Sequence, residues 1–78
     1  MRNKVVVQIP CLNEEKTIGI VVKDIKKKLP SAKIIVYDND SSDNSITVAK
    51  KSGAEMVIEK KRGKGNVVRR MFSDVMDA

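Results

Sequence analysis

The stretch Val5-Val6-Val7-Gln8-Ile9-Pro10-Cys11-Leu12-Asn13-Glu14-Glu15 decides the fold of this chain. It opens as a nearly unbroken apolar run and then turns polar, as a buried parallel strand does before a loop and a helix. Proline has no N–H for a ladder, so strand pairing is expected to stop at Pro10. Asn13 is predicted to be a helix N-cap, with Glu14 and Glu15 in the first turn, where carboxylates interact favourably with the helix dipole.

The composition describes one small basic domain with an aliphatic core. The 78 residues are too few for two cores, and Tyr37 and Phe72 are the only aromatic residues. Sixteen Lys and Arg against ten Asp and Glu give a net charge of +6, which favours an anionic partner such as a nucleotide, a nucleic acid or a lipid headgroup. The sequence has no histidine and only Cys11 as cysteine, which excludes histidine-based metal sites and triads and an internal disulfide.

Downstream of this stretch, the apolar pattern alternates between helical and extended periods. Residues 33–37 and 55–59 predict two further strands. A second helix is predicted from Ser42 or Asp43 to a stop at Gly53. The apolar faces of the first and third helices are predicted to be Ile18, Val21, Val22, Ile25 and Leu29, and Val68, Met71, Phe72 and Val75. This alternation predicts an α/β fold of three-layer, Rossmann-like form, with a parallel sheet in the order 3-2-1 and helices on both faces.

In such a sheet all strand-to-helix loops lie at one edge, here residues 10–14, 38–43 and 60–65. Asp38 or Asn39 could bind a base edge or a ribose hydroxyl, and Lys64 could bind a phosphate. Gly63 and Gly65 would let the backbone approach such a ligand closely. The simpler interpretation of the acidic residues in the second loop is that they serve as turn and cap residues. The Gly-Lys-Gly run lacks the spacing of a Walker A loop.

Three motifs in this order, residues 9–15, 36–43 and 62–65, resemble the nucleotide-binding half of a family 2 glycosyltransferase of the GT-A fold. The chain is similar in particular to dolichyl or polyprenyl phosphate sugar transferases. The family usually has an acidic pair where this chain has Asp38-Asn39, and glycine is frequent where Asp40 stands. This departure leaves open whether the base is uridine or guanosine.

The resemblance implies transfer of a sugar from a UDP- or GDP-type nucleotide sugar to a phospholipid or similar acceptor. It implies nucleotide-binding roles for Pro10, Cys11, Leu12, Asn13, Glu14, Asp38, Asn39 and Lys64. Family members hold Mg or Mn on an Asp-x-Asp motif after a fourth strand. The helical pattern that continues to Asp77 leaves no room for that strand. Residues 1–78 are therefore interpreted as a single partial domain, truncated before that motif, without catalytic residues, metal ligands or a cofactor of its own.

Three classes of function follow for the chain by itself. It could be the nucleotide-binding fragment of a glycosyltransferase, inactive alone, or a stand-alone nucleotide-binding or regulatory module. A basic nucleic-acid-binding domain is the third class, although the aromatic platforms of single-strand binders are missing. Without a fourth strand, residues 5–9 would form an exposed edge, so self-association through the first strand is expected. The expected location is the cytoplasm, or the cytoplasmic face of the membrane for the parent enzyme.

Overall fold

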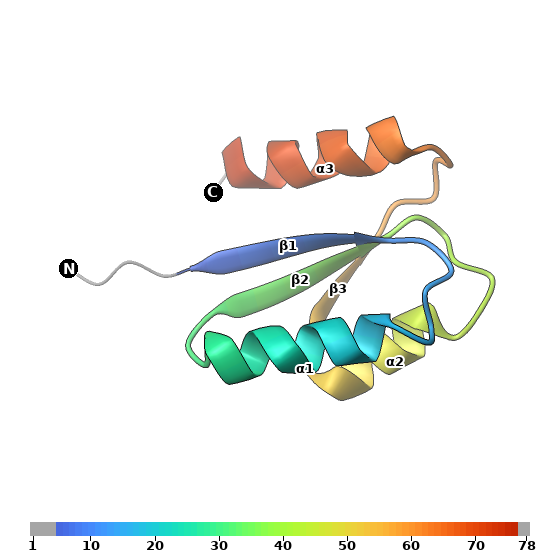
Figure 1. The fold of residues 1–78 in the computed structure, drawn as a ribbon. Helices are drawn as coiled ribbons and strands as arrows, with labels where there is room; N and C mark the ends of the chain where they lie inside the picture. Colours follow the sequence, from blue (N-terminus) through green and yellow to red (C-terminus); the bar gives the residue numbers. More distant parts are fainter. Residues whose placement is uncertain (1–4, 77–78) are drawn as a thin grey trace.

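The computed structural model describes residues 5–76, in which strands and helices alternate (Figure 1). The elements are β1 (Val6–Cys11), α1 (Ile18–Lys28), β2 (Lys33–Asp38), α2 (Ser45–Ser52), β3 (Glu55–Ile58) and α3 (Lys64–Met76). The strands form one sheet in the order β1-β2-β3, and both pairs are parallel. The predicted α/β alternation and sheet order are confirmed. Asp77, which the sequence placed at a helix end, lies outside the described residues.

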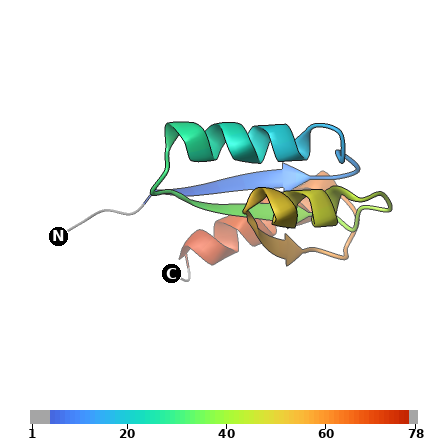
Figure 2. The same cartoon turned by 90° about the horizontal axis from the view of Figure 1, so that it is seen from below.

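The helices cover both faces of the sheet. In Figures 1 and 2, α1 and α2 lie side by side on one face and α3 lies alone on the other. All three helices begin at the edge of the sheet where the strands end. The three strand-to-helix loops therefore gather at that edge, as predicted. Within residues 5–76, no helix is long and apolar enough to cross a membrane.

The main core lies between the sheet and the α1/α2 layer. Its buried members are Cys11, Ile18, Val22, Ile34, Val36 and Ala49. Val21 was predicted to join them but is exposed. Gly19 approaches Val48 of α2, so Val21 lies on the other flank of α1, where no described element covers it. Leu29, the C-cap residue, is exposed as well.

Strand β1 does not stop at Pro10, contrary to the prediction. It continues to Cys11, and the Cys11 carbonyl accepts a 2.9 Å hydrogen bond from the N–H of Asn39. At the other end, the Val5 carbonyl accepts one from Lys33, so the odd-numbered residues of β1 direct their polar groups towards β2. The nitrogen of Pro10 points to the open edge, where it removes no ladder bond.

The start of α1 also differs from the prediction. The helix begins at Ile18, and the Glu14 carbonyl before it accepts hydrogen bonds from the N–H groups of Thr17 and Ile18. Asn13 adopts a left-handed backbone with φ of 52°, and its Oδ1 accepts a 2.8 Å hydrogen bond from the N–H of Ser42. The N-cap assignment was therefore wrong. Asn13 caps the neighbouring loop, and both glutamates precede the helix.

Helix α3 packs on the sheet through a different stripe from the predicted one. Val67 is buried, and Met71 and Asp74 are half-buried. Of the predicted face only Met71 contributes, because Val68, Phe72 and Val75 are exposed. The two stripes adjoin on the helix and share Met71, but the buried one also carries Asp74, so the apolar pattern favoured the stripe that is exposed.

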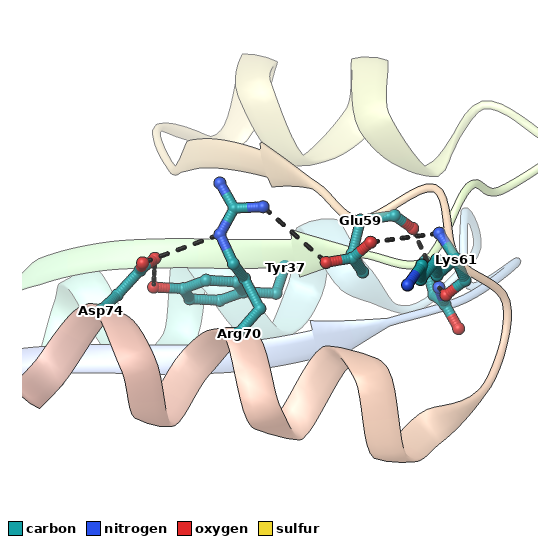
Figure 3. A network of polar contacts seen from close by, with 6 residues as sticks. Tyr37, Glu59, Lys61, Arg70 and Asp74 are labelled. Atoms are coloured by element: carbon teal, nitrogen blue, oxygen red, sulfur yellow. Dashed lines mark hydrogen bonds and ion pairs between the residues drawn. The ribbon is translucent and has the colours of Figure 1, made fainter.

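A polar network explains which stripe faces the sheet (Figure 3). The Tyr37 hydroxyl donates a 2.7 Å hydrogen bond to Asp74 and accepts one of 3.1 Å from Gln8 Nε2. Arg70 lies between Asp74 at 3.6 Å and Glu59 at 3.8 Å. Because Gln8 and Tyr37 present polar groups beneath α3, the helix is held with Asp74 towards the sheet.

Candidate functional site

The first two loops at the strand ends are tied together by serine and asparagine side chains. Ser41 Oγ accepts a 2.9 Å hydrogen bond from the N–H of Asn13, and Ser45 Oγ accepts one of 2.7 Å from the N–H of Glu14. Asp43 accepts from the N–H of Glu15 at 3.2 Å and from the N–H of Ser45 at 2.9 Å. These bonds lower the pKa of Asp43, chiefly through its hydrogen bond with the Ser45 side chain. The sequence-based interpretation of this acidic residue as a turn residue agrees with these contacts.

Asp38 is fully buried at the end of β2, where its carboxylate closes the second loop. It accepts hydrogen bonds from the N–H of Ser41 at 2.7 Å and from the Ser41 hydroxyl. Asp40 between them has a left-handed φ of 62°, at the position where glycine is frequent in the resembled family. The Asp38 side chain is thus engaged within its own turn.

The third loop is held by Asn39, whose side chain is only 3% exposed. Its Nδ2 donates to the carbonyls of Glu59 at 2.9 Å and Lys61 at 2.8 Å. Its Oδ1 accepts a 2.9 Å hydrogen bond from the N–H of Gly63. Gly63 has φ of 129°, a conformation that favours glycine, and α3 begins at the next residue.

A pocket of about 230 Å³ lies where these loops meet. Its lining residues are Pro10, Cys11, Leu12, Glu14, Asn39, Lys64 and Val67. Among the predicted site residues, Asn13 and Asp38 do not line it, because their side chains hold the loops. Sequence reasoning missed Val67. Val67 reaches the pocket because its side of α3 faces the sheet, and no local sequence pattern indicates which side does so.

The pocket combines an apolar wall with charged groups. Lys64 is exposed and is the first residue of α3, so its ammonium adds to the positive end of the helix dipole. Glu14 adds a carboxylate from the first loop. Burial raises the pKa of the Cys11 thiol to about 11. At neutral pH this thiol is protonated, and it acts as a small apolar wall residue rather than as a nucleophile.

No group of three or more His, Cys, Asp or Glu in residues 5–76 is placed to hold a metal ion. Near the pocket, the Asp38 carboxylate is engaged by hydrogen bonds within its own loop. Glu14 is the one acidic residue among the lining residues. The described residues therefore do not fit a divalent metal by themselves.

A pocket at the carboxyl ends of parallel strands, bordered by the start of a helix, is where open α/β sheets bind their ligands. The fold and the pocket define an α/β domain of this class, with the cationic side chain of Lys64 among the lining residues. The family model described as Glycosyl transferase family 2 matches residues 6–75. The chain belongs to this family, which confirms the resemblance carried by the three motifs.

Curated relatives extend beyond the length of this chain. Protein RfbJ of Shigella flexneri is 51% identical over 71 residues, which cover 91% of this chain and 55% of that protein. The uncharacterized glycosyltransferase Rv0539 of Mycobacterium tuberculosis is 39% identical over 64 residues, or 82% of this chain and 28% of that protein. The chain thus spans about half of the first relative and under a third of the second.

Solved structures support the same fold. Glucosyl-3-phosphoglycerate synthase of M. tuberculosis is 30% identical with a TM-score of 0.79, over 91% of this chain and 30% of that one. Mannosyl-3-phosphoglycerate synthase from Rubrobacter xylanophilus is 29% identical with a TM-score of 0.78, over 91% of this chain and 27% of that one. The first enzyme has also been solved with UDP, and with Mn²⁺, UDP-glucose and phosphoglyceric acid.

Proposed function

We propose that this chain forms the nucleotide-binding part of a glycosyltransferase that uses a nucleoside diphosphate sugar of the UDP or GDP type. The observation that carries the proposal is the position of Lys64, which lines the pocket at the start of α3. An ammonium beside a helix N-terminus suits a diphosphate. The likeness to a synthase solved with UDP supports the proposal and makes UDP the first ligand to test.

The pocket residues divide by chemistry into three roles. The apolar side chains of Pro10, Leu12 and Val67 would pack against the base, and the protonated Cys11 thiol would fill the space behind them. The Glu14 carboxylate would accept hydrogen bonds from ribose hydroxyls, since it has no positive charge to offer a phosphate. Lys64 would bind the diphosphate.

Two predicted site residues would act by holding the loops in place. The side chain of Asn13 ties the first loop to the N–H of Ser42, and Asp38 closes the second loop around Ser41. We propose that both residues support nucleotide binding without contacting the nucleotide.

The whole enzyme would need groups beyond the pocket. A divalent metal, Mg or Mn, would stabilise the diphosphate leaving group of the donor. The related synthase solved with Mn²⁺ and UDP-glucose supports this requirement for the whole enzyme. We propose a phospholipid or similar phosphate-bearing acceptor at the cytoplasmic face of the membrane, and nucleotide binding without turnover by residues 1–78 alone.

A nucleotide titration followed by backbone amide NMR tests the proposal. UDP and GDP, each with and without Mn²⁺, should shift amides of residues 10–14, 39 and 63–67 in the folded chain. The Lys64→Ala variant should bind about tenfold more weakly, the typical loss for one charge-assisted contact. Lys60→Ala removes an equal charge from the same loop outside the pocket and should change affinity by less than about twofold. A folded wild-type chain without shifts at millimolar nucleotide would refute the proposal.

We propose in addition that the chain self-associates through β1. Because the odd-numbered residues of β1 pair with β2, the backbone N–H and C=O groups of Val6 and Gln8 face outwards. The Val6 side chain is 48% exposed. Arg70 reaches Glu59 on one flank of α3, so the exposed stripe with Phe72 lies on the other flank, above the open edge. A second copy would add its own β1 antiparallel to this one and cover both apolar surfaces.

Light scattering coupled to size exclusion, over a concentration series, tests this association. The wild type should form a dimer, and Val6→Lys and Phe72→Lys should be monomeric. Ile20→Lys places the same charge on an apolar residue that is 69% exposed on α1, and this variant should remain dimeric. A monomeric wild type at high concentration, or equal behaviour of all three variants, would contradict the proposal.

A further inference from the structure

We propose that Asn39 is a positioning residue of the nucleotide site, and that its amide group sets the conformation of the loop that carries Lys64. The role of the loop in ligand binding rests on the proposed function. The control of the loop by Asn39 does not depend on it. The proposal thus gives Asn39, which forms part of the pocket wall, the role of holding the cationic loop in its binding conformation.

Every polar atom of the Asn39 side chain is used by the backbone of this loop. The two N–H groups of Nδ2 bind the Glu59 and Lys61 carbonyls, and Oδ1 accepts from Gly63. The side chain is 3% exposed, so no water replaces these bonds at low cost. A hydrogen bond donated by its NH₂ group to a base would require one of them to break, and Oδ1, which already accepts from Gly63, is almost fully buried. Asn39 therefore acts on the nucleotide through the loop.

The loop needs this support because its backbone is unusual. Gly63 is held at φ of 129° directly before the first residue of α3. The Asn39–Gly63 bond fixes this residue from the position directly after β2, and Asn66 fixes the same turn from α3 through a 3.1 Å hydrogen bond to the Arg62 carbonyl. Two rigid elements thus determine the direction in which Lys64 leaves the loop.

In this chain the two carbonyls and the N–H group that contact the Asn39 side chain match an amide and not a carboxylate. Asparagine donates two hydrogen bonds and accepts others, whereas an ionised aspartate only accepts. With Asn39→Asp, one carboxylate oxygen could still accept from Gly63, but the other would face two carbonyl oxygens at the positions of Nδ2. Buried without a donor, that oxygen would either be protonated or push the loop away.

The charges around position 39 nearly balance. The titratable residues on its own loop, on the third loop with the adjoining Glu59, and across the pocket are Glu14, Asp38, Asp40, Asp43, Glu59, Lys60, Lys61, Arg62 and Lys64. Desolvation and the two carbonyl oxygens at the positions of Nδ2 would therefore decide, and both favour the protonated form of an introduced carboxyl. Its pKa should therefore lie above the ordinary value of about 4 for aspartate.

The test compares Asn39→Asp with Asn44→Asp. Asn44 stands at the same edge of the sheet, is exposed, and makes no side-chain capping bond at the start of α2. Carbon-detected NMR should give a raised pKa for the carboxyl introduced at 39 and an ordinary or lowered one at 44, where the helix dipole favours the anion. The Gly63 amide should lose protection from hydrogen exchange by about tenfold or more in the first variant only.

Nucleotide affinity tests whether the loop conformation set by Asn39 matters for ligand binding. At pH 8, Asn39→Asp should bind UDP about tenfold more weakly than the wild type, with partial recovery as the pH falls below the pKa of the introduced carboxyl. Asn44→Asp should bind like the wild type. If the wild type binds no UDP, the proposed function fails, while the Gly63 exchange and the carboxyl pKa still decide the role of Asn39.

A wild-type measurement covers the case in which Asn39→Asp does not fold. The side-chain NH₂ protons of Asn39 should exchange with solvent far more slowly than those of Asn44. Equal exchange of the two NH₂ groups would overturn the proposal. So would a folded Asn39→Asp variant with an ordinary carboxyl pKa and an unchanged Gly63 amide.

Discussion

The hydroxyl of Tyr37 donates a 2.7 Å hydrogen bond to Oδ2 of Asp74, which joins the central strand to α3. The Tyr37 side chain is fully buried, and its burial, followed by this hydrogen bond, raises the pKa of the phenol. Val67 is the one buried residue that the structure describes in α3. Since α3 also begins with Lys64, this polar contact helps to hold one wall of the pocket.

Tyr37→Phe is expected to lower the free energy of unfolding by about 1–2 kcal/mol, because Asp74 and Gln8 each lose a hydrogen-bond partner at a partly buried site. Urea unfolding followed by circular dichroism measures the change. Asp24→Asn breaks only the exposed pair with Lys28 and should cost less than about 0.5 kcal/mol. Equal losses in the two variants would show that the Tyr37 hydroxyl contributes nothing beyond a surface contact.

Cys11 should be a poor target for alkylation in the folded chain. Its pKa is raised from 9.0 to about 11, mainly by burial, so the thiolate fraction at pH 8 falls roughly hundredfold. Reaction with iodoacetamide at pH 8 should be slower by at least that factor than in guanidinium chloride. The raised pKa also means that, between pH 9 and about 11, the Cys11 thiol keeps its proton in the folded state and loses it in the unfolded state. Stability should therefore fall between pH 9 and about 11. Equal reaction rates in the folded and unfolded chain would contradict this account.

The elements were predictable where one local pattern decided them. The apolar runs before Pro10 and before Asp38 defined strands, and Gly53 ended α2 with φ of 107° as expected of a C-terminal glycine. The roles of Asn13 and Asn39 were not predictable in this way. Their partners lie 20 to 30 residues away in sequence, so the bonds exist only after the loops meet at the sheet edge.

The choice of stripe on α3 depended on tertiary contacts in the same way. The apolar pattern favoured the stripe of Val68, Phe72 and Val75, whereas the adjoining stripe faces the sheet. The polar Gln8 and Tyr37 on the sheet selected that stripe, which contains Asp74. The location of the site followed from topology, because every strand-to-helix loop of a parallel sheet lies at one edge. The contribution of Val67 to the pocket required knowledge of which stripe is buried.

Asp43 is expected to make the fold sensitive to acid. Hydrogen bonds, first from the Ser45 hydroxyl, lower its pKa below 3.8. A lowered folded-state pKa gives stability that is fully present above the ordinary pKa and is lost as the pH falls through the lowered value. The wild type should therefore lose more stability between pH 5 and pH 2 than Asp43→Asn, whose amide does not ionise. Thermal unfolding at both pH values measures the difference, and parallel pH profiles would rule out this role.

Alanine substitutions at Gly19 and Gly65 are expected to have opposite effects on stability. A Cβ at Gly19 would lie 2.9 Å from Val48 Cγ1 and 3.0 Å from Ser52 Oγ, so α1 and α2 would have to separate. This overpacking should cost about 1–3 kcal/mol, more than the helix propensity that alanine adds.

A Cβ at Gly65 would meet nothing within 4 Å, so Gly65→Ala should raise the free energy of unfolding by up to about 1 kcal/mol. Urea unfolding of both variants under identical conditions measures the two signs. If Gly65→Ala is stabilising yet weakens UDP binding, the glycine is present for the approach of the ligand to the backbone. A destabilised Gly65→Ala, or a Gly19→Ala as stable as the wild type, would contradict the packing described for these helices.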